Sequence, residues 1–206
     1  MKTIIFIDAA NLFYGGLKTL GWKIDYKKLH KYLREKYYAE EIYYFGGIET
    51  YDYMQTEMKN EYIQIKPFTD YLEKTISNFR GNKMEFMHLM KNYKITKFFG
   101  KLDEFKYILA LKPVKTYVNK VTKSISKKAD CDVDLAIGAI RKIDIYSRFI
   151  IMSGDVDFIP LYRFLLEKNK VLIVLSRSEN TSKQVKKMLG PKFVEFKTLK
   201  RKIEME

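Results

Sequence analysis

The chain has 206 residues, and its 47% hydrophobic content is enough apolar material for one folded domain with a core, which excludes a chain disordered throughout. Lys and Arg number 39 against 25 Asp and Glu, so the formal net charge is +14 and favours a polyanionic partner, above all nucleic acid. The single cysteine permits no internal disulfide, and neither a signal peptide nor a membrane-spanning run is present, so the expected setting is the cytoplasm.

The first half of the chain alternates between strand and helix patterns. A fully apolar run ends at Asp8, as in a buried parallel strand, and a short helical turn should follow it. Asp25 can cap a helix whose apolar residues recur at spacings of three and four. The elements predicted here are strands over 3–8, 41–45 and 94–99, a helix after Asp25, and helices within 52–65 and 68–92.

In the second half, the secondary-structure patterns are weak over 101–128 and clearer after it. Within that stretch only 107–111 resembles a strand. The elements predicted beyond it are a helix opened by Asp130 or Cys131, strands over 149–152 and 171–175, and helices over 158–167 and from Asn180 or Thr181 to Leu189. Alternating strands and helices predict an α/β fold of three layers, with a mostly parallel central sheet flanked by helices, in a single domain over 1–206.

Acidic residues follow two of the predicted buried strands. Asp8 ends the first, with Asn11 one turn on, and Asp155 and Asp157 follow the strand over 149–152. Ligands of open α/β sheets bind at the carboxyl edge, where such side chains emerge. Each acid could instead cap the turn or helix that follows it, and capping explains one of Asp155 and Asp157 but not both.

A third acidic cluster lies at the start of the helix near 131. Asp130 and Asp134 share a helix face, whereas Asp132 points elsewhere, and spacing alone does not choose Asp132 over Asp134. A solvated acidic turn is the alternative. Clustered carboxylates repel each other and lose solvation, so a bridging divalent cation is the simplest explanation, and oxygen ligands suit Mg²⁺ or Mn²⁺.

The basic residues are unevenly distributed along the chain. Lysines without any acid fill the segment 112–128, and a second basic group lies near the C-terminus. The candidate phosphate-binding lysines of the first group are Lys120, Lys123, Lys127 and Lys128. Tyr107 and Tyr117 could stack on bases, although they are equally suited to a core. A general lysine bias of the genome is the alternative explanation.

Three motifs together resemble a known family. The runs 6–12 (Phe-Ile-Asp-Ala-Ala-Asn-Leu), 131–137 (Cys-Asp-Val-Asp-Leu-Ala-Ile) and 151–161, which contains Ser-Gly-Asp-Val-Asp-Phe, resemble the NYN domain of the LabA-like group, a branch of the PIN-like ribonucleases. The last motif is the most specific. The resemblance implies a PIN-like fold over about 1–200.

The resemblance also implies a site. Its metal-binding acids would be Asp8, Asp132 and Asp155, with Asp157 as a further catalytic acid and with Asn11 and Ser153 as polar, substrate-binding support. The register of the second motif selects Asp132. Many members carry another Asp six residues later, where this chain has Gly138, and its loss could weaken a metal site.

These expectations converge on a metal-dependent ribonuclease, most simply an endonuclease, with RNA as its partner and Mg²⁺ or Mn²⁺ as its cofactor. One rival is a non-catalytic RNA-binding or regulatory module, which Gly138 makes credible. A metal-dependent phosphatase acting on small phosphoesters is the other. The lysine-rich segments favour a polymeric substrate over a small one.

Overall fold

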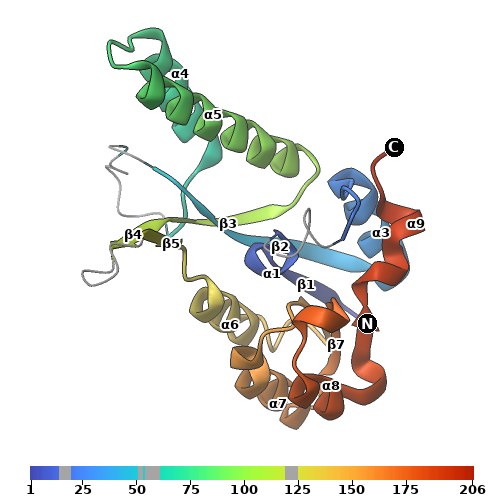
Figure 1. Ribbon diagram of the computed structural model, residues 1–206. Coiled ribbons are helices and arrows are strands. Elements are labelled where there is room, and N and C mark those ends of the chain that lie inside the picture. Colours follow the sequence, from blue (N-terminus) through green and yellow to red (C-terminus); the bar gives the residue numbers. More distant parts are fainter. Residues whose placement is uncertain (14–19, 51–52, 54–60, 119–124) are drawn as a thin grey trace. The chain divides into compact units, whose positions relative to one another are not determined.

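The apolar runs of the sequence form a six-stranded sheet in the order β3-β2-β1-β6-β7-β8, of which β1, β2, β3 and β7 are labelled in Figure 1. Neighbouring strands from β2 to β8 in this order pair in parallel, as expected for an α/β fold. The strands are β1 (Thr3–Asp8), β2 (Ala39–Ile48), β3 (Ile108–Pro113), β6 (Arg148–Met152), β7 (Val171–Ser176) and β8 (Phe193–Glu195). The predicted α/β class with a mostly parallel sheet is confirmed.

The computed structural model describes residues 1–13, 20–50, 53, 61–118 and 125–206. The chain forms two compact units, and the strands β2 and β3 run through both. Unit 1 comprises 1–45, 105–108 and 131–206, and unit 2 comprises 46–104 and 109–130. Within the described ranges, no helix is both long and apolar enough to cross a membrane.

Helices flank the sheet in unit 1. They are α1 (Ala9–Phe13), α3 (Tyr26–Tyr37), α6 (Asp132–Arg141), α7 (Ile159–Glu167), α8 (Lys183–Leu189) and α9 (Lys200–Ile203). Short 3-10 turns join them, namely η1 (Val156–Phe158), η2 (Ser178–Asn180), η3 (Gly190–Lys192) and η4 (Phe196–Leu199). The strands β1 and β6 lie at the centre of the core, because every side chain over 4–7 and 149–151 is fully buried.

The directions of α3 and α6 fix which helix ends lie at the carboxyl edge. Tyr26, at the start of α3, packs edge-on against Tyr44, which lies beside Ile7 near the end of β1. Later in the same helix, the Tyr37 carbonyl accepts a hydrogen bond of 3.3 Å from Arg148, at the start of β6. The helix α3 therefore runs from the carboxyl edge to the amino edge.

The helix α6 runs in the same sense. The chain beyond its C-terminus reaches the amino edge, where the Ser147 N–H donates to the Lys2 carbonyl at 3.1 Å. The helix itself packs against β1, since a Cβ added at Gly138 would lie 3.4 Å from Phe6. Asp132, at the N-terminus of α6, therefore faces the opposite, carboxyl side of the sheet.

Unit 2 contains a helical pair and a hairpin. The helices α4 (Ile65–Ser77) and α5 (Lys83–Glu104) pack together, and β4 (Lys115–Val118) pairs antiparallel with β5 (Ile125–Lys128). The predicted strand over 94–99 is wrong, because this segment lies inside α5. The buried positions of α5 recur at the helical spacings of three and four, and this period outweighs the local β-propensity: Leu89, Asn92, Thr96, Phe99 and Leu102.

Other boundaries differ from the predictions by smaller amounts. The strand expected over 41–45 extends from 39 to 48, so the pair Gly46-Gly47 continues it instead of closing it. The helix before Leu189 is capped by Ser182, whose side chain accepts from the Val185 N–H, one residue after the later of the two predicted caps. Most of the helix expected in 52–65 lies outside the described residues, and α4 begins only at Ile65.

Candidate active site

Asp8 ends β1 and is held at a fixed position by three hydrogen bonds. Its Oδ1 accepts from the backbone N–H groups of Ala10 and Asn11 at 3.0 and 3.3 Å. Its Oδ2 accepts from Ser153 Oγ at 2.9 Å. The side chain is only 7% exposed, and burial raises the pKa of Asp8, with a smaller contribution from the charge of Asp155. Asp8 thus caps the next turn and also carries a desolvated charge.

Ser153 links Asp8 to the acids that follow β6. The residue before it, Met152, pairs with Ile7, so the parallel register brings the ends of β1 and β6 side by side. Ser153 Oγ donates to Asp8 and accepts from the Asp155 N–H at 3.3 Å. Asp155 in turn accepts from the Asp157 N–H at 3.0 Å and so caps η1. The Asp157 side chain is exposed.

Gly154 allows the end of β6 to approach the segment after β7. A Cβ at this position would lie 2.7 Å from Ser176 Oγ and 3.0 Å from Thr181 Cα, and closer still to Thr181 Oγ1. Any side chain would therefore displace the backbone or the two hydroxyl groups. The glycine of the Ser-Gly-Asp motif serves close packing between adjacent strand ends.

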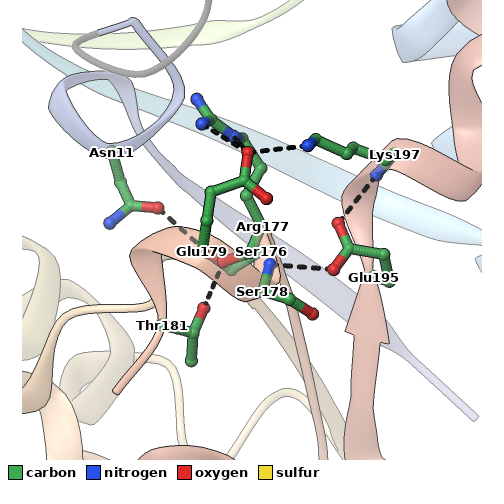
Figure 2. Close-up of polar contacts among 8 residues, drawn as sticks. All are labelled: Asn11, Ser176, Arg177, Ser178, Glu179, Thr181, Glu195 and Lys197. Carbon is green, nitrogen blue, oxygen red and sulfur yellow. Dashed lines mark hydrogen bonds and ion pairs between the residues drawn. The ribbon is translucent and has the colours of Figure 1, made fainter. Parts of the chain in front are cut away.

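Ser176 positions the side chain of Asn11. Its hydroxyl donates to Asn11 Oδ1 at 3.0 Å (Figure 2). Because the amide oxygen is engaged in this bond, the amide nitrogen is the end left to donate to a ligand. The bond joins the start of α1 to the end of β7, so Asn11 is fixed from a third strand of the sheet.

A charged cluster directly after Ser176 anchors this strand end (Figure 2). The Arg177 side chain is 1% exposed, and its Nε and Nη2 donate to Glu179 Oε1 at 3.1 and 2.7 Å. Lys197 lies 2.9 Å from the same oxygen, and these cations lower the pKa of Glu179 to about 2. Glu195 accepts from the backbone N–H groups of Ser178 and Lys197.

Asp132 reaches the same edge from α6. It is the first residue of α6, directly after the N-cap residue Cys131, which is one of the two residues predicted to open the helix, and its side chain is half-buried. Gly138 lies six residues further on in the helix, where a Cβ would make ordinary contacts with Phe6 at 3.4 Å and Phe45 at 3.6 Å. A side chain at position 138 would thus contact two aromatic rings of the sheet before it could reach the carboxyl edge.

The predicted site residues are brought together to different degrees. Asp8, Ser153 and Asp155 form one hydrogen-bonded chain, and Asn11 joins them through the adjacent strand end. Among the residues that the structure describes, no group of three or more His, Cys, Asp or Glu is placed to hold one metal ion. The oxygen donors present still suit Mg²⁺, which keeps several waters and binds through one or two carboxylates together with substrate phosphates.

Most of the residues predicted to contact RNA lie outside the part of the chain that the structure describes, or only their side chains do. Lys120 and Lys123 lie outside the described residues, as do the side chains of Lys127, Lys128 and Tyr117. Tyr107 is only 2% exposed and donates its hydroxyl to the Tyr26 carbonyl at 2.8 Å. It is therefore a core residue and not a platform for bases.

Several residues of the site were missed from the sequence. Ser176 ends β7, Arg177 and Thr181 follow it, and all three are buried. Tyr162 donates to the Ser153 carbonyl at 3.0 Å. A signal was present for Ser176, because it is a polar residue at the end of a buried parallel strand, as Asp8 is. No pattern in the sequence pairs Asn11 with a residue 165 positions away.

Comparisons with known proteins identify the family and a similar fold. The family model of the NYN domain matches residues 2–195. The fold is similar to the crystal structure of a protein of unknown function from Vibrio parahaemolyticus, with a TM-score of 0.54, 18% sequence identity, and coverage of 90% of this chain and 87% of that one. At this identity the likeness concerns the fold alone. No curated protein matches the chain.

Proposed function

The chain belongs to the NYN domain family, a branch of the PIN-like nuclease superfamily, and from this membership we propose that it is a divalent-metal-dependent ribonuclease of the LabA-like group. The proposed reaction is hydrolysis of RNA phosphodiester bonds within the strand. The observation that carries the proposal is the hydrogen-bonded chain from Asp8 through Ser153 to Asp155 at the carboxyl edge of a parallel sheet.

The state of Asp8 supports a cation-binding role. A capping carboxylate on a surface turn keeps its hydration, whereas Asp8 is almost fully buried and lies near a second acid. The hydrogen bonds to Asp8 offset only part of that cost, because burial is the largest influence on its pKa. A bound cation would offset the rest.

Mg²⁺ or Mn²⁺ is the proposed cofactor. Asp8 and Asp155 would hold the ion, which would supply an activated water and neutralise charge on the phosphate. Asp132 is the third metal-binding acid that the family resemblance implies, and among the described residues it forms no three-acid group with Asp8 and Asp155. Ser153 fixes the positions of Asp8 and Asp155 relative to each other through its two hydrogen bonds. Asn11, whose amide oxygen is engaged by Ser176, would donate its N–H groups to a phosphate oxygen. The exposed Asp157 would accept the proton that the attacking water loses and pass it to solvent.

RNA is the proposed substrate, and the net charge of +14 supports a polyanion. The lysines at 120, 123, 127 and 128 remain candidates for backbone contacts that give affinity without sequence choice. Cys131 is the single cysteine of the chain, so it forms no internal disulfide, which suits a reducing compartment, and we propose the cytoplasm.

Cleavage assays test this function. The protein is incubated with labelled single-stranded RNA, with DNA of the same sequence and with a small phosphomonoester, each in Mg²⁺, in Mn²⁺ and in EDTA. We expect internal cleavage of RNA in either metal and none in EDTA. Hydrolysis of the monoester alone would indicate a phosphatase, and RNA cleavage that persists in EDTA would contradict a metal-dependent site.

A non-catalytic RNA-binding module is the second candidate. Gly138, at the position where the family resemblance implies an acid, favours it, as does the lack of a three-carboxylate group among the described residues. A protein that binds RNA yet cleaves no substrate in either metal would establish this alternative.

A further inference from the structure

A basic pocket lies on unit 1, between the outer face of α3 and the short helix α9. It is an open cavity of about 570 Å³. Its lining consists of four lysines, one tyrosine and one glutamate: Lys28, Lys31, Tyr32, Glu35, Lys36 and Lys202. Both helices belong to unit 1 and pack against each other, so a single unit forms the whole pocket.

Tyr32 brings two ammonium groups together from different elements. Lys36 Nζ, from α3, and Lys202 Nζ, from α9, each lie 5.3 Å from the centroid of the Tyr32 ring. The ring is largely buried, and among the described residues its hydroxyl has no hydrogen-bond partner. The negative face of an aromatic ring attracts cations, so Tyr32 can hold both lysines near the pocket.

The positive charge of the pocket is only partly neutralised. Lys28 is paired with Glu206 at 2.7 Å, and Lys31 is 3.8 Å from Glu35 in a largely exposed pair. Within the described ranges, neither Lys36 nor Lys202 has a carboxylate within ion-pair distance. Two like charges gathered on one ring without a counterion make a site for an anion.

The two lysines gathered on Tyr32 lie away from the carboxylate edge, whereas Lys28 lines the pocket from the first turn of α3. The helix α3 runs from the carboxyl edge to the amino edge, and Lys36 is in its last turn. Ten residues of helix separate Lys36 from Tyr26, a rise of about 15 Å. One phosphate group at Asp8 and Asp155 therefore does not also reach Lys36, whereas a polymer could reach both places.

We propose that this pocket binds backbone phosphates of RNA at a second place, outside the carboxylate edge. The choice of RNA over other polyanions rests on the proposed function. The lysines contribute affinity and footprint but no base readout, because ammonium groups contact phosphates without reading sequence. Short oligonucleotides bound at the edge would not engage the pocket, and longer strands would engage both.

The test measures RNA binding by fluorescence anisotropy in the Asp155→Asn background, so that cleavage does not interfere. The variant Lys36→Gln/Lys202→Gln is compared with Lys168→Gln/Lys170→Gln, which removes the same charge near the C-terminus of α7. Each is titrated with single-stranded RNA of about 16 and about 4 nucleotides, the range of site sizes known for such binding. Circular dichroism checks that every variant is folded.

For the longer RNA we expect the pocket variant to weaken binding on the order of tenfold at low salt. The slope of log K against log salt should become shallower by about 1.4, the value for two lost contacts to a single strand. The control variant and the shorter RNA should show little change. The proposal would be overturned by an unchanged salt slope in the pocket variant, or by equal losses of RNA affinity in the pocket and control variants. It would also be overturned if the pocket variant lost binding to anionic lipid vesicles but kept its binding to RNA.

The outcome separates this proposal from the nuclease proposal. RNA binding that depends on the pocket, in a parent protein that cleaves nothing, would support the pocket and contradict the nuclease. Cleavage by the parent with a pocket variant that binds normally would do the reverse. A parent that binds no RNA would overturn the pocket proposal directly.

Discussion

The carboxylate edge and the α3–α9 pocket hold their charges in opposite ways. Asp8 is almost fully buried, and three hydrogen bonds, two of them from the backbone, fix its carboxylate. Lys36 and Lys202 are exposed, and flexible stems carry their charges to one ring. The edge therefore depends on exact placement, whereas the pocket depends mainly on net charge.

This difference teaches where single substitutions should matter. A buried group that loses its partner leaves an unsatisfied charge or donor, at a cost of about 1–3 kcal/mol or more. An exposed lysine returns to water without such a loss. The predictions below test this contrast, beginning with the largest expected effect.

Asp155→Asn should abolish metal-dependent RNA cleavage while the fold stays intact. The amide keeps the shape and can still accept the Asp157 N–H, but it removes charge that would hold the ion. Asp144→Asn is the matched control, since Asp144 is exposed near the amino edge. Full activity of the Asp155 variant in Mg²⁺ would assign cleavage to another site or to a contaminant.

Gly154→Ala should destabilise the fold by about 1–3 kcal/mol, the usual cost of overpacking. The new methyl group would overlap Ser176 Oγ and Thr181. Gly100→Ala is the control, because a Cβ there meets nothing within 4 Å. Urea denaturation measures both variants, and equal stability of the Gly154 variant and the parent would show that the strand ends separate freely.

Ser176→Ala should reduce activity by about 10–100-fold, the size of effect seen when a group that orients a site residue is removed. Loss of the hydroxyl frees the Asn11 amide to rotate. Because Asn11 is proposed to bind phosphate, KM should rise more than kcat falls. Ser178→Ala is the control, since it is the Ser178 backbone N–H that bonds to Glu195. Equal kinetics for the two variants would remove Ser176 from the site.

Asp8→Asn should raise the melting temperature at neutral pH in EDTA. Burial raises the pKa of Asp8 above its ordinary value of 3.8, so the folded state binds this proton more tightly than the unfolded state. Stability therefore falls as the pH rises from 3.8 through the folded pKa, and the full penalty is present above it. The variant should lose this dependence. Mg²⁺ should stabilise the parent more than the variant.

The smallest effect is expected in the pocket. Lys36→Gln and Lys202→Gln should each change the free energy of unfolding by less than about 1 kcal/mol, because an exposed cation–π contact contributes no more than that. Thermal melts measure this change. A larger loss from either substitution would mean that the lysines serve the fold, and would weaken the contrast with the edge.

The sequence predicted the elements whose pattern is local. The strands β1, β6 and β7 were recognisable because a parallel strand buried on both faces is a continuous apolar run. The strand predicted over 94–99 was wrong, because short runs of β-branched and aromatic residues also occur on helices. The hairpin β4–β5 was missed, since its lysine-rich strands show no clear alternation.

The site was predictable where a residue ends a recognisable strand. Asp8 and Asp155 were identified in this way, Ser153 through the family resemblance, and hydrogen bonds join the three in the structure. Ser176 and Arg177 were not, because their roles depend on partners brought together by the fold. The pocket was hidden for the same reason: Lys28, Lys31 and Lys36 read as a solvated helix face until α9 brings Lys202 to Tyr32.

The Ser153 hydroxyl has a spectroscopic consequence. Its single hydrogen is committed to Asp8, and Ser153 is fully buried, so this proton should exchange slowly with solvent. Such a proton can give a separate resonance in a nuclear magnetic resonance spectrum. A cation binding at Asp8 would withdraw electron density from the accepting oxygen and shift that resonance, so the site carries its own reporter of ion binding.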